Sequence, residues 1–393
     1  MTTIESKSKT MLKNLTSKKV KLHTHLGKDG EGLYTASTKG CFDVIDEATP
    51  LVLDCLNHIS LPNESERAFV IADYGTADAG TSLGLMNLIV NTVRQKVGKN
   101  LEISIQYEDQ KDNEWKSVFN HVLGFKQVTN AYGEILKTPR TNDESKIFVN
   151  ACGVSFHKQA YPSNSVDLGF SFTAMHWLSQ SPSSFKGTEI MHASGCNDLN
   201  ICRGEKEQAA IDWNSIIKSR CKELRVGGRM VIVNFCISKE GYYLGNTEIG
   251  VNMWDSFVIC WNKLAEEGLI DEEERLGVSF PSYYRSYQES VEGAEAIDGI
   301  KVIDCIEKIV RCPYREEWTS GKSNRTPLEH AEWYVPTTRT WSESTFKQAL
   351  KNDKDKEKIM EKFWKHYVDL VAAEPEKHGM DYVHTYLVIE KTH

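Results

Sequence analysis

Two acidic residues lie where strand-like segments of the 393-residue chain end, and glycines follow the first of them. Asp73 closes the segment FVIAD and is followed by Gly75 and Gly80, whereas Asp109 follows the segment ISIQYE. Glycines at such a turn let backbone amides approach a ligand at the start of a helix. An acid after a second strand can accept hydrogen bonds from ribose hydroxyls. The pattern predicts a nucleoside-binding turn, and a plain strand-to-helix turn with surface acids is the alternative.

The turn lacks both common fingerprints for phosphate groups. Gly75 and Gly80 have the glycine spacing of GxxxxGK[ST], but Thr81 replaces the phosphate-binding lysine. Residues 76–78 break the GxGxxG pattern of dinucleotide sites, and Asp78 would place negative charge where a pyrophosphate rests. S-adenosyl-L-methionine carries no phosphate and has cationic ammonium and sulfonium groups. An acid-flanked turn therefore favours this cofactor.

Six short apolar segments rich in branched residues alternate with stretches of helical periodicity. The segments are 69–72, 103–107, 147–151, 166–172, 230–235 and 386–389. Strands that alternate with helices predict an α/β fold with a mostly parallel sheet covered on both faces. The segment RVGGRMVIVNF predicts a helix that ends at Gly227-Gly228 and then a central strand.

The pattern changes after residue 240, where an aromatic-rich helix candidate, VNMWDSFVICWNKLAEEGL, precedes loop-like segments. We expect four parts along the chain. These are a flexible basic leader over 1–20, the first part of the core over 21–240, a mainly helical substrate cap over 241–345, and a C-terminal helix and strand that return to the core over 346–393.

Composition excludes several classes of protein. The chain is 40% hydrophobic and 26% charged, as in ordinary globular proteins. A formal net charge of −8 argues against a nucleic-acid partner, and no apolar segment reaches the roughly 20 residues that a membrane span needs. The ten cysteines form no CxxC pair, so we expect reduced thiols, a cytoplasmic location and no metal site.

The segment SFTAMHWLSQSP, residues 171–182, resembles the Ser-x-x-x-x-x-Trp-Leu-Ser-x-x-Pro segment of the SABATH (salicylic acid/benzoic acid/theobromine) methyltransferases. Further similar segments follow in register over most of the chain. They are GEGLYTAST, IADYGTADAG, YEDQKDNEWKSVF, GVSFHKQAYP, VGGRMVI and FPSYYRSYQESVE. The resemblance implies a Rossmann-like class I methyltransferase sheet with an inserted α-helical cap, and a homodimer. It also implies methyl transfer from S-adenosyl-L-methionine, with S-adenosyl-L-homocysteine as product, to a small molecule.

The resemblance also implies the residues of the site. Those that match cofactor-binding positions are Asp73, Gly75, Ser82, Asp109, Gln110, Ser155, Phe156, Thr38 and Tyr34. On the substrate side, Trp177 matches a tryptophan whose indole N–H donates to a carboxylate. Met253 and Trp254 match an apolar pair on the cap helix.

Three positions near the acceptor depart from the plant pattern. Cys41 stands where carboxyl-methylating members have a glutamine, and a thiol is a poor donor. His176 replaces an apolar residue, and Thr173 replaces a tyrosine. His176 either supplies the donor that Cys41 does not, binds a differently shaped acceptor, or is packed without a role. We assign Trp177 and His176 to catalysis as orienting donors; Cys41, Thr173 and His25 join the substrate-binding set.

These features predict a methyltransferase that acts on the carboxylate of a small organic acid. Family members methylate a carboxylate oxygen or, in some cases, a ring nitrogen, so a small heterocyclic amine or amino acid is the alternative acceptor. A carboxylate needs only positioning, whereas a phenol would need a base such as His176 or His25. A metal site built on His23 and His25 would need further ligands, and none stands out. A non-catalytic binding protein that kept the cofactor fold is the remaining alternative.

Overall fold

The computed structural model describes residues 27, 29–64, 66–140, 145–182, 185–196, 198, 200–352 and 355–393. Its main sheet has the strand order β5-β2-β1-β6-β7-β10-β9, and a short strand, β8, pairs with β7. The strands are β1 Phe69–Tyr74, β2 Ile103–Glu108, β5 Ile147–Cys152, β6 Val166–Phe172, β7 Leu224–Ile237, β8 Arg285–Ser286, β9 Ile300–Val310 and β10 Tyr382–Lys391. Among the described strands of this sheet, β10 alone runs in the direction opposite to the others. All six predicted strands are confirmed.

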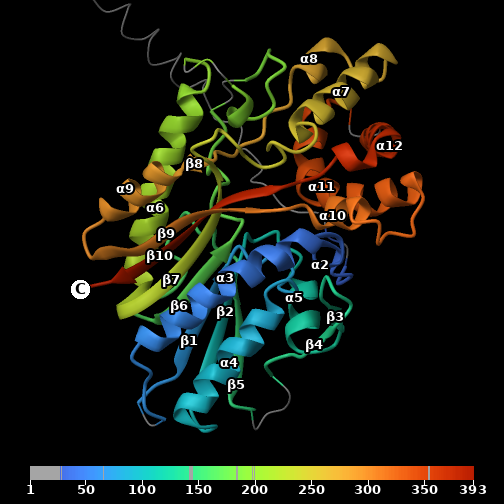
Figure 1. Ribbon diagram of the computed structural model, residues 1–393. Coiled ribbons are helices and arrows are strands. Elements are labelled where there is room, and N and C mark those ends of the chain that lie inside the picture. The colour runs from blue at the N-terminus through green and yellow to red at the C-terminus, as the bar shows by residue number, and fades with distance from the viewer. Residues whose placement is uncertain are drawn as a thin grey trace, which may run out of the picture.

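Helices cover both faces of the sheet, as the alternating pattern predicted (Figure 1). On β7, Val231 and Val233 belong to the apolar core beneath α3 and α4, whereas Met230 and Ile232 belong to the core beneath α6 and α9. This alternation follows from the two-residue period of a strand. The helices on this part of the chain are α2 Leu33–Ser37, α3 Lys39–His58, α4 Leu83–Val97, α5 Trp115–Val122, α6 Arg203–Glu223 and α9 Tyr287–Glu295. A separate two-stranded sheet pairs β3 (Val128–Thr129) with β4 (Ile135–Leu136).

The prediction that a helix ends at Gly227-Gly228 was wrong. Helix α6 ends at Glu223, and both glycines lie inside β7. The pairing with β6 jumps from Val166↔Leu224 to Leu168↔Arg229, so the glycine pair lies in a bulge. Gly227 has a φ of 76°, which suits either a helix end or a bulge, and the strand uses it for the bulge.

Further helices lie beyond the carboxyl ends of the parallel strands, where they cluster at one end of the sheet (Figure 1). They are α7 Met253–Glu266, α8 Glu272–Arg275, α10 Pro313–Thr319, α11 Pro327–Ala349 and α12 Lys356–Ala373. The side chain of Asn252 accepts a hydrogen bond from the Trp254 amide and so caps α7. The stretch 241–345 is therefore rich in helices, but it also contributes β9 to the sheet. The leader over 1–20 lies outside the described residues.

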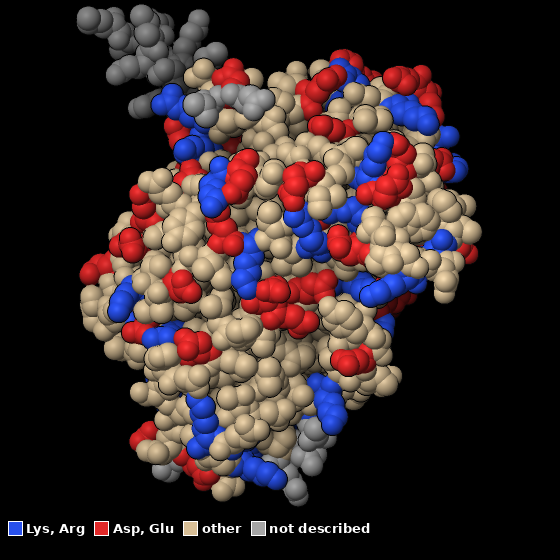
Figure 2. All heavy atoms as spheres, viewed as in Figure 1, with Lys and Arg blue, Asp and Glu red and all other residues tan. Residues whose placement is uncertain are grey.

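The surface mixes charges of both signs. On the face seen in Figure 2, Lys and Arg are interspersed with Asp and Glu and form no extended basic patch. Within the described ranges, no helix is both long and apolar enough to cross a membrane. In the same part of the chain, no cluster of three or more His, Cys, Asp or Glu side chains is placed to hold a metal ion.

Candidate active site

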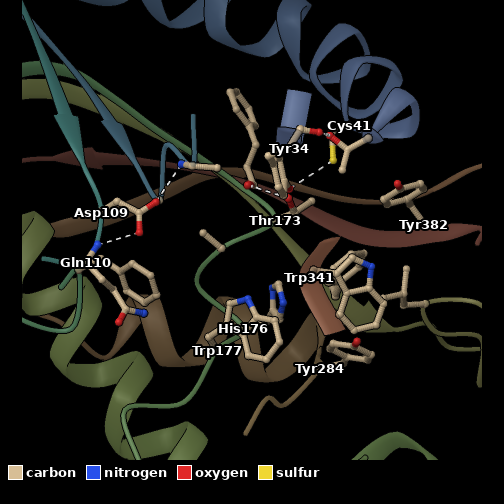
Figure 3. A pocket seen from close by; sticks show the side chains of 18 of the residues that line it. Tyr34, Cys41, Asp109, Gln110, Thr173, His176, Trp177, Tyr284, Trp341 and Tyr382 are labelled. Carbon is tan, nitrogen blue, oxygen red and sulfur yellow. Dashed lines mark hydrogen bonds between the residues drawn. The ribbon is translucent and has the colours of Figure 1, made fainter. Parts of the chain in front are cut away.

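One pocket opens at the carboxyl ends of the parallel strands, beside the point where β1 lies between β2 and β6. Chain connections diverge at such a point in an open α/β sheet and leave a crevice for a ligand. The loops after β1, β2, β5 and β6 form one side of the pocket, and α2, α3, α11 and the cap close the other (Figure 3). Lining residues are Tyr34, Thr38, Cys41, Gly75, Ala77, Asp109, Gln110, Phe156, His157, Phe172, Thr173, Ala174, His176, Trp177, Leu178, Phe235, Leu244, Tyr284, Trp341, Met380 and Tyr382.

Asp109 organises the turn after β1. One carboxylate oxygen, Oδ2, accepts a hydrogen bond from the Ala77 amide at 2.8 Å, and Oδ1 accepts one from the Gln110 amide at 2.7 Å (Figure 3). Gly75 and Ala77 have φ values of 73° and 51°, so the turn bends through left-handed residues. Asp109, Gln110 and Gly75 all line the pocket, as expected of a ligand-binding turn.

The Asp78 carboxylate makes its hydrogen bonds outside the pocket. Its Oδ2 accepts a hydrogen bond from the Thr35 amide at 2.9 Å, and its Oδ1 accepts one from the Thr35 hydroxyl at 2.5 Å. The His121 ring bonds to the Asp78 carbonyl oxygen at 2.7 Å. The acid that breaks the dinucleotide pattern therefore fastens the turn to α2.

Asp73 and Ser82 lie beneath the turn and do not line the pocket. The Ser82 hydroxyl donates to Asp73 Oδ2 at 2.7 Å, and the Thr76 hydroxyl donates to the same oxygen at 3.2 Å. Burial raises the pKa of Asp73 to about 7, although both hydroxyls oppose the shift. Asp73 is therefore a carboxyl group whose charge responds to its surroundings near neutral pH.

The loop after β5 places Phe156 on the pocket and is held from below by a buried ion pair. Arg220 donates to the Phe156 carbonyl at 2.9 Å and to the Lys158 carbonyl at 2.8 Å. Its Nε pairs with Glu223 at 2.7 Å, and both side chains are fully buried. Ser155 does not line the pocket; its hydroxyl bonds to the ring of His157 at 2.9 Å. Neither Arg220 nor Glu223 was predicted as a site residue. Their charges near the end of a helix are the only signal in the sequence that they form such contacts.

The acceptor end of the pocket joins two segments that are far apart in the chain. Tyr34 comes from α2 and Cys41 from α3, and their side chains lie 3.5 Å apart at Oη and Sγ. Burial raises the pKa of the Cys41 thiol, so the thiol is neutral. His176 and Trp177 come from the loop after β6, with ring centroids 5.2 Å apart. Figure 3 shows these two rings on the side of the pocket opposite Cys41.

Aromatic rings pack around His176 and form the wall behind it. The His176 ring lies 4.8 Å from Phe235 and 5.8 Å from Tyr284. Only 3% of His176 is exposed, so the imidazole sits in a nearly dry site. Phe235 and Trp341 were not predicted as site residues, because buried aromatic residues at a site resemble core residues in sequence.

Met253 and Trp254 lie outside the pocket lining. The Trp254 indole N–H donates to the Leu244 carbonyl at 3.1 Å, and the Trp254 ring stacks on His192 at 4.6 Å. Tyr284 packs on the same His192 ring at 4.2 Å. Leu244 and Tyr284 thus reach the pocket, and Trp254 supports them from behind. His25 lies outside the described residues.

The start of β10 brings Met380 and Tyr382 to the pocket, and Asp381 between them anchors that position. Asp381 accepts a hydrogen bond from the Thr247 hydroxyl at 2.6 Å and pairs with Arg315 at 2.5 Å. Burial alone would raise the pKa of Asp381, but the hydrogen bond and charge of Arg315 hold it below its ordinary value. This buried pair ties the cap to the sheet next to the acceptor site.

Thr173 has a φ of 56°, a left-handed conformation that a β-branched residue rarely adopts. Its amide donates to the Val233 carbonyl at 2.8 Å, which holds the residue in place at the end of β6. Such a conformation costs about 1–2 kcal/mol, and strain of this kind gathers at functional sites. Thr173 lines the pocket, so the strain lies at the acceptor end.

Thr173→Asn is expected to raise the free energy of unfolding by about 1 kcal/mol, because asparagine tolerates left-handed backbone better. Denaturant titration measures the change. Thr173→Val is the matched control, because it removes the hydroxyl and retains both the branched Cβ and the strain. Equal stability of the two variants would show that the left-handed conformation is not strained.

The polar groups of the pocket suit a cationic nucleoside. Asp109 contributes a carboxylate, and within the part of the chain that the structure describes the lining contains no lysine or arginine that could pair with a phosphate. Phe156 offers an aromatic face, and the turn at Gly75 and Ala77 offers close backbone approach. This set of groups fits S-adenosyl-L-methionine and does not fit a nucleotide with a pyrophosphate.

The strand order with antiparallel β10 between β7 and β9, and the pocket beyond β1 and β2, define a class I methyltransferase fold. A solved structure, loganic acid methyltransferase with SAH, shares the fold with a TM-score of 0.72 at 19% identity, covering 94% of this chain and 99% of that chain. A family described as SAM dependent carboxyl methyltransferase matches residues 19–392. The chain belongs to this family, which confirms the resemblance to the SABATH methyltransferases.

Individual relatives differ in the acceptor that their names give. The chain is 26% identical over 369 residues to the probable 7-methylxanthine methyltransferase 2 of Theobroma cacao, covering 90% of this chain and 91% of the relative. It is 25% identical over 331 residues to the loganic acid O-methyltransferase of Catharanthus roseus, covering 78% and 81%. The protein is thus an S-adenosyl-L-methionine-dependent small-molecule methyltransferase, as predicted.

Proposed function

We propose that the protein methylates the carboxylate of a small organic acid and releases the methyl ester and S-adenosyl-L-homocysteine. The observation that carries this proposal is the pair of N–H-bearing rings on adjacent residues, His176 and Trp177, at the acceptor end of an aromatic pocket. Two N–H donors match the two oxygens of a carboxylate, and the aromatic wall suits an apolar body. The family to which the chain belongs supports the same acceptor.

The cofactor would be held by residues from the loops after β1, β2 and β5, by Tyr34 of α2, and by Thr38 between α2 and α3. We assign direct contact to Gly75, Asp109, Gln110, Phe156, Thr38 and Tyr34, which line the pocket, and a supporting role to Asp73, Ser82 and Ser155, which lie outside the lining. Asp109 would accept hydrogen bonds from the ribose, and Phe156 would pack against the adenine. When bound, S-adenosyl-L-methionine supplies an electrophilic methyl group on a positively charged sulfur.

The residues at the acceptor end orient and desolvate the acceptor. Trp177 and His176 donate hydrogen bonds to a carboxylate that is already ionised at neutral pH, so no base is required. Cys41 and Thr173 complete the acceptor contacts. The neutral Cys41 thiol does not repel an anion, and the aromatic wall excludes water. Catalysis then comes mainly from positioning.

The assay that tests this proposal is incubation with radiolabelled S-adenosyl-L-methionine and a panel of small carboxylic acids and N-heterocycles. Labelled product that mild base hydrolyses identifies a methyl ester. Base-stable product on a nitrogen would overturn carboxyl transfer. Absence of product from every class in the panel would count against both acceptors.

A small heterocyclic amine or amino acid is the second candidate acceptor. Cys41 replaces the glutamine of carboxyl-methylating plant members, and one relative is named for a methylxanthine. Cys41→Gln separates the two acceptors. It should raise turnover of a carboxylic acid about tenfold if the glutamine adds one hydrogen bond to the carboxylate. A fall in turnover of a carboxylic acid would favour the amine.

Asp73 is expected to make cofactor binding depend on pH. Its pKa of about 7 in the free protein falls when a cationic ligand binds nearby, because the cation favours the ionised carboxylate. Affinity for S-adenosyl-L-methionine should therefore rise about tenfold from about pH 6 to about pH 8, with release of a proton. Calorimetry in buffers of different ionisation enthalpy measures that proton.

The matched variant for this experiment is Asp73→Asn, which cannot titrate. Its affinity should be nearly independent of pH, and a slope that persists in it would contradict the role of Asp73. The raised pKa has a second consequence with a defined sign. The folded state binds the proton more tightly than the unfolded chain, so the free energy of unfolding contributed by Asp73 falls as pH rises from about 4 to about 7.

We also propose a homodimer that acts in the cytoplasm without a nucleic-acid partner. All ten cysteines are free thiols, which suits a reducing compartment. Size-exclusion chromatography with light scattering tests the dimer against a monomer mass of 44.6 kDa.

A further inference from the structure

The geometry points to His157 as a positioning residue that holds Trp177 in place for the acceptor. His157 was not singled out in the sequence, and it lines the pocket between the cofactor loop and the acceptor loop. The inference rests on the proposed role of Trp177, and it applies to whichever acceptor the protein methylates.

The His157 ring bridges the two loops through both of its nitrogens. Nε2 lies 3.0 Å from the Trp177 carbonyl oxygen, and Nδ1 lies 2.9 Å from the Ser155 hydroxyl. The ring also packs on Phe156, with centroids 4.5 Å apart. One imidazole therefore connects the residue expected to orient the acceptor with the loop expected to hold the adenine.

The hydrogen-bond partners determine the tautomer. A carbonyl oxygen only accepts, so Nε2 carries the proton and donates it to Trp177. In the neutral ring, Nδ1 then accepts from the Ser155 hydroxyl. Burial lowers the pKa of His157, while Asp212, 3.8 Å away, opposes the shift. A neutral ring at neutral pH makes both hydrogen bonds at once.

Three side chains hold the acceptor loop, each at a different point. Arg285 donates to the Met175 carbonyl at 3.1 Å. Asp212 accepts from the Ser179 amide at 2.8 Å and from the Ser179 hydroxyl at 2.6 Å. His157 holds the middle point, at Trp177 itself, and of these three side chains it alone belongs to the loop that carries Phe156. Backbone hydrogen bonds from Tyr283 to the His176 carbonyl and from Leu178 to the Pro281 carbonyl also hold the loop. His157 adds the bond to the carbonyl of Trp177 itself, and we infer that this bond sets the position of the indole.

This arrangement predicts which kinetic constant depends on His157. Arg220 holds the Phe156 carbonyl independently of His157. The loop expected to hold the adenine should therefore keep its position when the imidazole is removed. Without the bond to its carbonyl oxygen, Trp177 can shift, and a displacement of about 1 Å can cost up to about 100-fold in rate. The loss should fall on kcat and not on cofactor affinity.

Two substitutions test the assignment. His157→Phe retains the ring packed on Phe156 and removes both hydrogen bonds, whereas His157→Gln retains a donor close to the position of Nε2. We expect kcat to fall about 10- to 30-fold in His157→Phe and to recover to within about threefold of the parent in His157→Gln. The dissociation constant for S-adenosyl-L-methionine should stay within about twofold in both. The exposed neighbour Lys158→Ala is the control and should match the parent.

A double-mutant cycle separates action through Trp177 from a general loss of structure. If His157 acts through Trp177, then His157→Phe should lower kcat by less than about twofold when Trp177 is already phenylalanine. Additive losses would overturn the proposal. The acceptor for this double-mutant cycle is the compound that the assay with radiolabelled S-adenosyl-L-methionine identifies, whether it is an acid or an amine.

A readout without turnover distinguishes failure of this inference from failure of the proposed function. In protein labelled with [15N]tryptophan, the Trp177 indole resonance is assigned by its loss in Trp177→Phe. It should move in His157→Phe and stay in place in Lys158→Ala. An unmoved resonance would refute the positioning role even if no acceptor is found.

Discussion

Replacing Trp177 by phenylalanine is expected to lower kcat/KM for the acceptor acid at least about 100-fold. Trp177 lines the acceptor end of the pocket beside His176. Phenylalanine retains the aromatic ring but has no N–H, so the carboxylate loses a donor that orients it toward the cofactor. A fixed donor of this kind contributes about 2.7–4 kcal/mol in other enzymes, which corresponds to about 100- to 1000-fold in rate. Steady-state kinetics with radiolabelled cofactor measures the loss.

The comparison variant for this experiment is His176→Met, which restores the apolar residue usual at that position. We expect a smaller loss, about tenfold, because one of two donors remains. Unchanged turnover would refute a donor role for His176. Unchanged kcat/KM in Trp177→Phe would contradict the proposed orientation of the acceptor, provided that the dissociation constant for the cofactor is also unchanged.

The buried strands of the sheet could be predicted from the sequence because each is a short, nearly continuous apolar segment. β9 was missed for the opposite reason. Its sequence, IKVIDCIEKIV, interleaves charged and apolar residues, as suits an edge strand with one solvated face. Gly227 was misread because a helix end and a β-bulge both use a left-handed glycine, and only the pairing with β6 decides between them.

The cofactor side of the site could be predicted because its residues follow strand ends that the fold brings together. Asp109 and Phe156 illustrate this, since Asp109 comes directly after β2, Phe156 lies in the loop after β5, and both line the pocket. The supporting groups could not be predicted in this way. Arg220 reaches the Phe156 carbonyl across 64 positions in the chain, and Asp381 pairs with Arg315 across 66. Such pairs depend on how helices pack against loops.

The acceptor wall shows a further limit of sequence reasoning. The resemblance to the family predicts Trp254 as a substrate contact, and Leu244 lies close to it. In the structure the Trp254 N–H donates to the Leu244 carbonyl. Leu244 lines the pocket, and Trp254 packs behind it. The two residues differ in the direction of their side chains, and the start of α7 sets the direction of the Trp254 side chain.

Asp109→Ala is expected to weaken binding of S-adenosyl-L-methionine about 100-fold. The carboxylate accepts two backbone hydrogen bonds, from Ala77 and Gln110, and an ionised carboxylate has about four acceptor positions. Two acceptor positions therefore remain for ribose hydroxyls. Hydrogen bonds to a charged group contribute about 1.5–3 kcal/mol each. Loss of about 3 kcal/mol corresponds to a little over 100-fold in the dissociation constant. Calorimetric titration with the cofactor measures it.

Two further variants separate the ribose contact from the support that Asp109 gives to the turn. Asp109→Asn retains one acceptor oxygen and should weaken binding only about tenfold. Asp112→Ala removes an exposed acid three residues later and should leave the affinity unchanged. If Asp109→Ala lowers the free energy of unfolding but not the affinity of the protein that remains folded, the carboxylate serves the turn alone. The ribose would then require another acceptor, and the nucleoside-binding role inferred from the end of β2 would be wrong.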